Sequence, residues 1–154
     1  MRRHSMPEPE AETDASAAEL QRTLQLLLPI RRQRLSRSER QQREQEQALR
    51  AVVDKTVHTE RKLDEKKGEY QQIRAGFMQQ NAGVQQAKFR LERALQCEQQ
   101  AAEEVDRQRL SLHELAEQQQ QQQQRVEQAQ RETRLRLRDV EKLEYLLQQN
   151  EVSG

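Results

Sequence analysis

The chain has 154 residues, a net charge of +1, no tryptophan and only 3% aromatic side chains, while 34% of its residues are charged. So few large apolar side chains cannot fill a compact core, which argues against a globular enzyme with a buried pocket. The abundant Leu, Glu, Gln, Arg and Ala favour long helices. A net charge near zero gives no overall attraction to nucleic acid or to anionic lipid.

The first 16 residues are acidic, contain two prolines and show no periodicity. We therefore expect residues 1–16 to form a disordered acidic extension. Ser16 and Glu19 fit a capping box, which would start a helix at about residue 17. Residues 1–19 carry a net charge of −3. No apolar leader or membrane-spanning stretch is present, so a cytoplasmic location without direct membrane insertion is expected.

A heptad repeat begins in the first half of the chain, and its members are Leu28, Leu35, Gln42, Leu49, Thr56, Leu63, Tyr70 and Phe77. A period of 3.5 residues sustained over this length is typical of helices that supercoil. It predicts a helix over about 17–78. Pro29 lies inside this helix and removes one backbone hydrogen bond, so we expect either a kink there or a separate short helix over 17–28.

A second heptad repeat follows the segment 79–83, which contains Asn81 and Gly83 and predicts a turn. Its members are Val84, Leu91, Glu98, Val105, Leu112, Gln119, Val126, Thr133, Val140 and Leu147. They predict a second helix over about 84–149, which includes seven consecutive glutamines, 118–124, with Gln119 and Gln122 at core positions.

The predicted fold is therefore all-α: a long antiparallel two-helix coiled-coil hairpin over 17–150. A turn at 79–83 would place Leu63 and Tyr70 opposite residues 91–98, and residues 24–35 opposite 126–140. Because Ile73 and Phe77 stand close to the turn, we expect the seam to be better filled there. Arg31, Ser38, Gln42 and Gln45 should weaken it near the termini.

Two groups of residues are candidate binding surfaces. Residues 31–43 hold six arginines against one glutamate, and the opposite segment of the second helix is also rich in arginine. Arginine makes bidentate contacts to carboxylates and phosphates. The candidate basic residues are Arg31, Arg32, Arg34, Arg37, Arg40, Arg43, Arg131, Arg134 and Arg138. The candidate contacts near the turn are Tyr70, Ile73, Phe77 and Phe89, among which Phe89 lies off the heptad positions.

Catalytic and metal-binding patterns are missing from the sequence. The three histidines are far apart, and no glycine-rich phosphate loop or nucleophile motif occurs. The lone Cys97 excludes an intramolecular disulfide. We expect no enzymatic activity, no metal and no cofactor.

Two segments resemble the type III secretion stalk proteins, the YscO/HrpO group related to flagellar FliJ. They are Leu26-Leu27-Leu28-Pro29-Ile30-Arg31-Arg32-Gln33-Arg34, followed by Ser38-Glu39-Arg40, and Arg134-Leu135-Arg136-Leu137-Arg138-Asp139-Val140-Glu141-Lys142-Leu143-Glu144. Pro29, the acidic start and the glutamine run depart from that family's pattern.

The resemblance implies a non-catalytic helical hairpin on the cytoplasmic side of the inner-membrane export apparatus. Members stand in the central hole of a hexameric ATPase, enter the ring with their termini and point their tip at the export gate protein. Some also bind chaperones of exported proteins. The residues themselves leave three alternatives open. The first is a homodimeric coiled-coil scaffold, the second a basic-region nucleic-acid binder, which the missing base-contacting Asn and Ala argue against, and the third an amphipathic membrane helix over 20–34.

Overall fold

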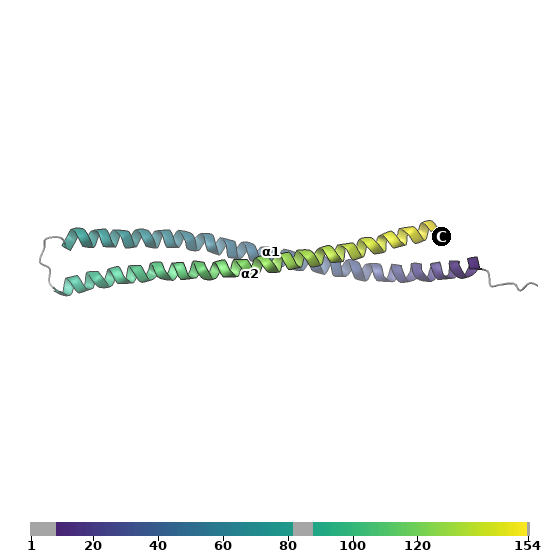
Figure 1. Cartoon of the computed structure of the whole chain (residues 1–154), viewed down its shortest axis with the longest axis horizontal. Coiled ribbons are helices and arrows are strands. Elements are labelled where there is room, and N and C mark those ends of the chain that lie inside the picture. Colours follow the sequence, from purple (N-terminus) through teal and green to yellow (C-terminus); the bar gives the residue numbers. More distant parts are fainter. Residues whose placement is uncertain (1–8, 82–87, 154) are drawn as a thin grey trace, which may run out of the picture. The chain divides into compact units, whose positions relative to one another are not determined.

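The computed structural model describes residues 9–81 and 88–153. The chain forms two helices, α1 (Pro9–Asn81) and α2 (Lys88–Ser153), which pack against each other as a two-helix hairpin (Figure 1). The predicted all-α hairpin is confirmed. The chain divides into two units, each of which holds part of both helices: unit 1 is Met1–Glu46 with Arg125–Gly154, and unit 2 is Gln47–Gln124.

Helix α1 begins at Pro9, eight residues before the predicted start. The prediction of disorder is therefore wrong for residues 9–16, while residues 1–8 lie outside the described part. Proline is favoured in the first turn of a helix, because the N–H that it lacks would have no helical partner there. The helix already includes Ser16, so the capping box is wrong, and it continues through Pro29, so the separate helix over 17–28 is wrong too.

In unit 1 the two helices run antiparallel, as their hydrogen bonds show. The Asn150 side-chain amide donates to the backbone oxygen of Ala17 at 3.0 Å and to Oε1 of Gln21 at 2.6 Å. Further along α1, Arg31 contacts Asp139, which lies earlier in α2. Increasing residue numbers in α1 therefore meet decreasing numbers in α2.

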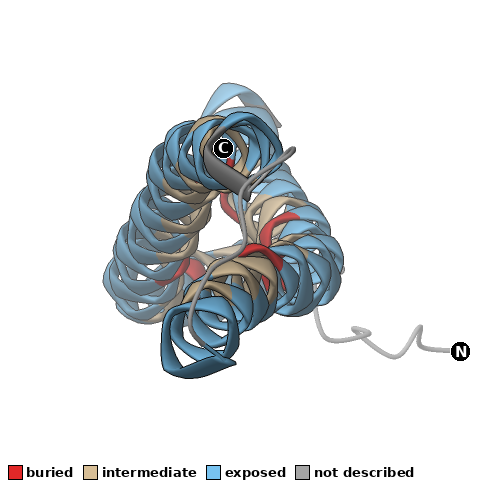
Figure 2. Cartoon of the chain, turned by 90° about the vertical axis from the view of Figure 1, so that its left-hand side faces the viewer, coloured by how far each residue is buried: buried red, intermediate tan, exposed pale blue. Residues whose placement is uncertain are grey.

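Unit 2 has the same antiparallel order. Residues of α1 near His58 share a surface hollow with Leu115, and residues near Tyr70 share one with Ala102. Ile73 shares a third hollow with Ala94. Figure 2 shows the buried and half-buried positions of both helices as narrow bands, with exposed surface over the rest of each ribbon.

The buried positions follow the predicted heptads. The buried apolar side chains are Leu24, Leu63, Val105, Leu115, Val126 and Val140, and the buried polar ones are Ser38 and Gln122. Each stands at a heptad position or three residues after one, if the first repeat is extended back to Gln21 for Leu24. Gln119 is half-buried, so the glutamine run passes through the seam of the helix as predicted. The hairpin therefore closes along one stripe of each helix.

The predicted register between the helices is wrong by about one heptad. Helix α1 continues to Asn81, so residues 79–81 of the predicted turn are helical, and α2 begins at Lys88. Residues 82–87, which include the predicted start of the second helix, lie outside the described part. As a result Tyr70 lies opposite Ala102 and Val105 instead of residues 91–98.

The expectation of a better-filled seam near the turn is also wrong. Ile73 and Leu91 are exposed, whereas Leu24, Val126 and Val140 in unit 1 are buried. Small residues explain the difference, because Gly76 and Ala94 leave a hollow beside Ile73. The size of the facing side chain, as well as the apolar residue itself, decides whether a seam position is closed.

Candidate partner-binding surfaces

The predicted basic residues of unit 1 fall into two groups, the first of which is engaged within the hairpin. The Arg31 guanidinium lies 3.1 Å from the Asp139 carboxylate, and that of Arg32 lies 3.1 Å from Glu144. Both pairs join α1 to α2. These two arginines are therefore paired across the helices and offer less charge to a partner than their number in the sequence suggests.

The second group projects from α1 without a charged partner. Arg34, Arg37, Arg40 and Arg43 are exposed. Within the described ranges none of them lies within ion-pair distance of a carboxylate, in contrast to Arg31 and Arg32. Exposed guanidinium groups that are not paired keep their full capacity for bidentate contacts with an outside carboxylate or phosphate.

A third basic group lies on α2. Arg131, Arg134 and Arg138 surround the exposed side chain of Leu135 at a shallow hollow of about 200 Å³. The spacing of 3, 4 and 7 residues puts all four side chains on one helix face. Arg131 also donates from Nε to the backbone oxygen of Glu127 at 3.5 Å. Because Leu135 lies between three guanidinium groups, this hollow suits a partner that presents an apolar side chain between acidic ones.

The four residues predicted near the turn belong to unit 2, and they do not form one cluster. Tyr70 and Phe77 are half-buried in the seam, while Ile73 and Phe89 are exposed. Ile73 and Phe77 line a hollow of about 410 Å³ together with Cys97. Phe89 stands outside that hollow, so it is the aromatic side chain most available to another molecule.

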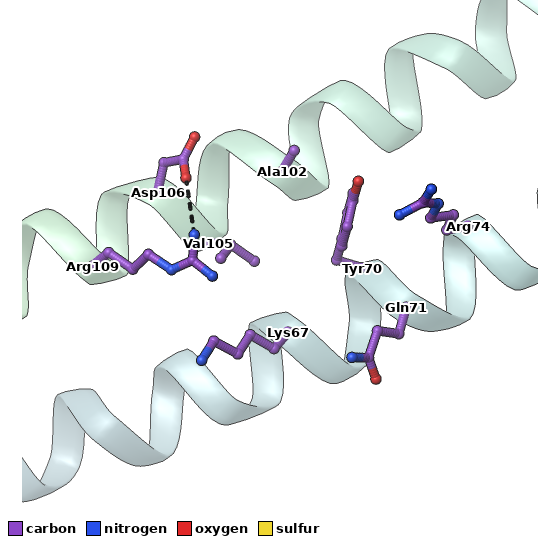
Figure 3. Close-up of a pocket in the computed structure, with 8 residues that line it drawn as sticks. All are labelled: Lys67, Tyr70, Gln71, Arg74, Ala102, Val105, Asp106 and Arg109. Atoms are coloured by element: carbon purple, nitrogen blue, oxygen red, sulfur yellow. Dashed lines mark ion pairs between the residues drawn. The ribbon is translucent and has the colours of Figure 1, made fainter.

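A larger hollow of about 520 Å³, also in unit 2, was not predicted (Figure 3). It is lined by Lys67, Tyr70, Gln71 and Arg74 of α1 and by Ala102, Val105, Asp106 and Arg109 of α2. The Tyr70 ring stands between the helices, with Arg74 to one side and Lys67 and Arg109 to the other (Figure 3). Arg109 lies 3.8 Å from Asp106 in its own helix.

This hollow exists because Ala102 is too short to fill the space beside the Tyr70 ring. Its rim carries three cations against one carboxylate, so it too favours an acidic group. Sequence reasoning missed it because the pairing of Tyr70 with Ala102 depends on the register. The alternation of large and small residues along the two heptad repeats would be the signal to look for.

The described side chains form no group of three or more His, Cys, Asp or Glu that could hold a metal ion. Cys97 is a free, exposed thiol, and His113 lies 3.3 Å from Glu117 one helical turn away. Within residues 9–81 and 88–153, neither helix contains an apolar stretch long enough to cross a membrane.

The chain matches no protein-family model, no curated protein and no solved structure.

Proposed function

We propose that this chain is a non-catalytic stalk subunit of a type III secretion export apparatus. In this role unit 1 binds the hexameric export ATPase through its arginines, and residues of unit 2 near the turn contact the export gate protein. The subunit works in the cytoplasm, beside the inner membrane, and needs no cofactor.

One observation carries the proposal: the two segments that resemble the stalk proteins contact each other. They are more than a hundred residues apart in the sequence, yet Arg31 of the first segment pairs with Asp139 of the second, and Arg32 pairs with Glu144. The antiparallel hairpin brings both segments into unit 1. Their contact supports a single basic surface built from both ends of the chain.

The charges on this surface support an acidic partner. Arg34 and Arg37 on α1 and Arg134 and Arg138 on α2 make no ion pair with the described carboxylates, although unit 1 contains many glutamates. Charged rims of this kind direct association and orientation. An ATPase ring with acidic residues around its central opening would match them.

The proposed contact with the export gate protein is based on the exposed residues of unit 2 near the turn. Phe89 and Ile73 offer apolar contacts, and the hollow at Tyr70 is flanked by cations. These features suit docking to the gate protein or to a chaperone of an exported protein, which are the partners that the resemblance implies.

A pull-down with the export ATPase tests the proposal. The wild-type chain should bind the hexamer, and Arg34→Glu combined with Arg37→Glu should weaken binding by about 10-fold or more, because two favourable charge contacts become repulsive. The matched control is Arg90→Glu with Arg93→Glu, a pair with the same spacing, exposed on α2 of unit 2. This control should bind normally, and circular dichroism should show equal helicity in all three proteins.

If the wild-type chain does not bind the ATPase, the proposal is refuted. If the control pair loses as much ATPase affinity as the Arg34 and Arg37 variant, the arginines of unit 1 are not the binding surface. Position in the genome offers a second test, because a stalk gene is expected directly beside the export ATPase gene.

The alternative functions predict different results. A generic homodimeric scaffold has a dimer mass and no affinity for the ATPase. A nucleic-acid binder would bind DNA with an affinity that falls steeply as salt increases.

A further inference from the structure

Helix α1 carries a second apolar stripe, which α2 leaves uncovered. Leu24 and Leu28 face the seam, whereas Leu20, Leu26 and Ile30 are 49%, 72% and 47% exposed. A helix that is apolar on most of its circumference is usually covered on more than one side. The stretch 20–30 therefore has a contact surface beyond the one that α2 occupies.

The charges on either side of this stripe have opposite signs. On the C-terminal side, Arg34, Arg37 and Arg40 continue the same face of α1, because they follow Leu20, Leu26 and Ile30 at helical spacings. On the N-terminal side lies the carboxylate of Glu19, and residues 8–14 add further acidic residues to the sequence. Along α1 from its N-terminal side, this face therefore carries an acidic side chain, then apolar side chains, then basic ones.

A face with this order is complementary to an antiparallel copy of itself. When two copies of α1 cross near Leu26 and Leu27, the apolar stretches meet, and Glu19 of each copy lies opposite Arg34 of the other. Pairing in parallel would instead bring like charges together. Closed two-fold contacts, in which the same patch serves both subunits, are the commonest form of association between identical chains.

We propose that the chain forms an antiparallel dimer through this face of α1, with each hairpin intact. We define the α1 face as Glu19, Leu20, Leu26, Ile30, Arg34 and Arg37. A second copy matches both the carboxylate of Glu19 and the guanidinium groups of Arg34 and Arg37, whereas an anionic lipid surface would match only the arginines and repel Glu19. The proposal stands without the export function, but the dimer shares Arg34 and Arg37 with the proposed ATPase contact, so one chain cannot make both contacts at once. The dimer also differs from a scaffold in which helices exchange between chains.

From Glu19 to Arg37 the contact extends over about 19 residues of helix, or roughly 28 Å at 1.5 Å per residue. A contact of one helix per subunit is small for a protein interface, so the dimer should dissociate on dilution within the micromolar range. Its ion pairs are exposed to solvent, so raising the salt concentration should weaken it by a few-fold.

Sedimentation equilibrium of the full chain, over a range of concentrations, tests the dimer. The mass should move from one chain of 18.3 kDa towards two as the concentration rises. Leu26→Gln with Ile30→Gln should weaken dimerisation by about 10-fold or more, because both side chains leave an apolar contact. Both residues are exposed in the hairpin, so circular dichroism should show unchanged helicity.

The matched control is Leu95→Gln with Leu110→Gln, which removes two apolar side chains of unit 2 that are 48% and 59% exposed, close to the values for Ile30 and Leu26. It should dimerise like the wild type.

A charge exchange tests the antiparallel order. Arg34→Glu alone and Glu19→Arg alone should each weaken the dimer, and the two together should restore it, because the pair is rebuilt with its signs reversed. The restored variant would still lack Arg34, so it should not regain ATPase binding. Dimerisation and the proposed export function can therefore fail separately.

Three results would overturn the proposal: a chain that stays monomeric at about 100 µM, far above a micromolar dissociation constant; a dimer that tolerates the Leu26 and Ile30 substitutions; or single charge variants that the double exchange does not restore. Binding of the monomer to anionic vesicles through Leu26 and Ile30 would equally replace the dimer with a membrane contact.

Discussion

The contribution of the seam to stability can be measured with two leucines of the same helix. Leu115 and Leu110 both lie on α2 in unit 2, but Leu115 is 8% exposed and Leu110 is 59% exposed. Replacing Leu with Ala removes about three carbon atoms, worth about 2.4 kcal/mol when fully buried, at about 0.8 kcal/mol per carbon. The change in helix propensity is nearly the same at both positions and favours Ala slightly.

Scaled by burial, Leu115→Ala should lower the free energy of unfolding by about 2 kcal/mol, and Leu110→Ala by about 1 kcal/mol or less. The cavity left at Leu115 adds little, because this side chain already borders an open hollow near His58. Urea unfolding followed by circular dichroism at 222 nm gives both values. Equal losses at the two positions would refute the assignment of the seam, and a larger loss at Leu110 would put the seam on the other side of α2.

Three further predictions follow from described contacts. Gly68→Ala should raise the free energy of unfolding by about 0.5–1 kcal/mol, because nothing lies within 4 Å of the added methyl group; a loss in urea unfolding would mean that the site is closed. A double-mutant cycle of Arg31→Ala and Asp139→Ala should give a coupling of about 0.5 kcal/mol, since the side chains are 33% and 40% exposed; zero coupling would show that the pair does not hold the helices. Phe89→Ala should change stability by less than about 0.5 kcal/mol while lowering affinity for the export gate protein, and a large loss of stability would show instead that Phe89 packs internally.

The heptad period predicts most of the buried positions of the seam, although Ile73 and Leu91 are exposed. Leu63, Val105 and even Gln122 are buried because 3.5-residue spacing keeps them on one stripe of a supercoiled helix, whatever their chemistry. The sequence does not predict the start of α1 at Pro9, because no apolar pattern precedes residue 17.

The register could not be obtained from the same period. Sliding one helix past the other by seven residues leaves every apolar position facing the seam, so the repeat cannot distinguish the two arrangements. The pairing of Arg31 with Asp139 and the hollow between Tyr70 and Ala102 both depend on that choice. The sequence therefore predicts which arginines form the basic surface. It does not predict which of them pair across the helices and which project into solvent.

The narrow seam also determines how stability responds to temperature. No side chain in the described part of the chain is completely buried. Unfolding therefore exposes less apolar surface to water than it does in a globular protein of this length, and this exposure is the source of the heat capacity change. Calorimetry should give a value below the usual ~12–15 cal/mol/K per residue. The free energy of unfolding would then follow a flatter curve with temperature, and cooling would weaken the hairpin very little.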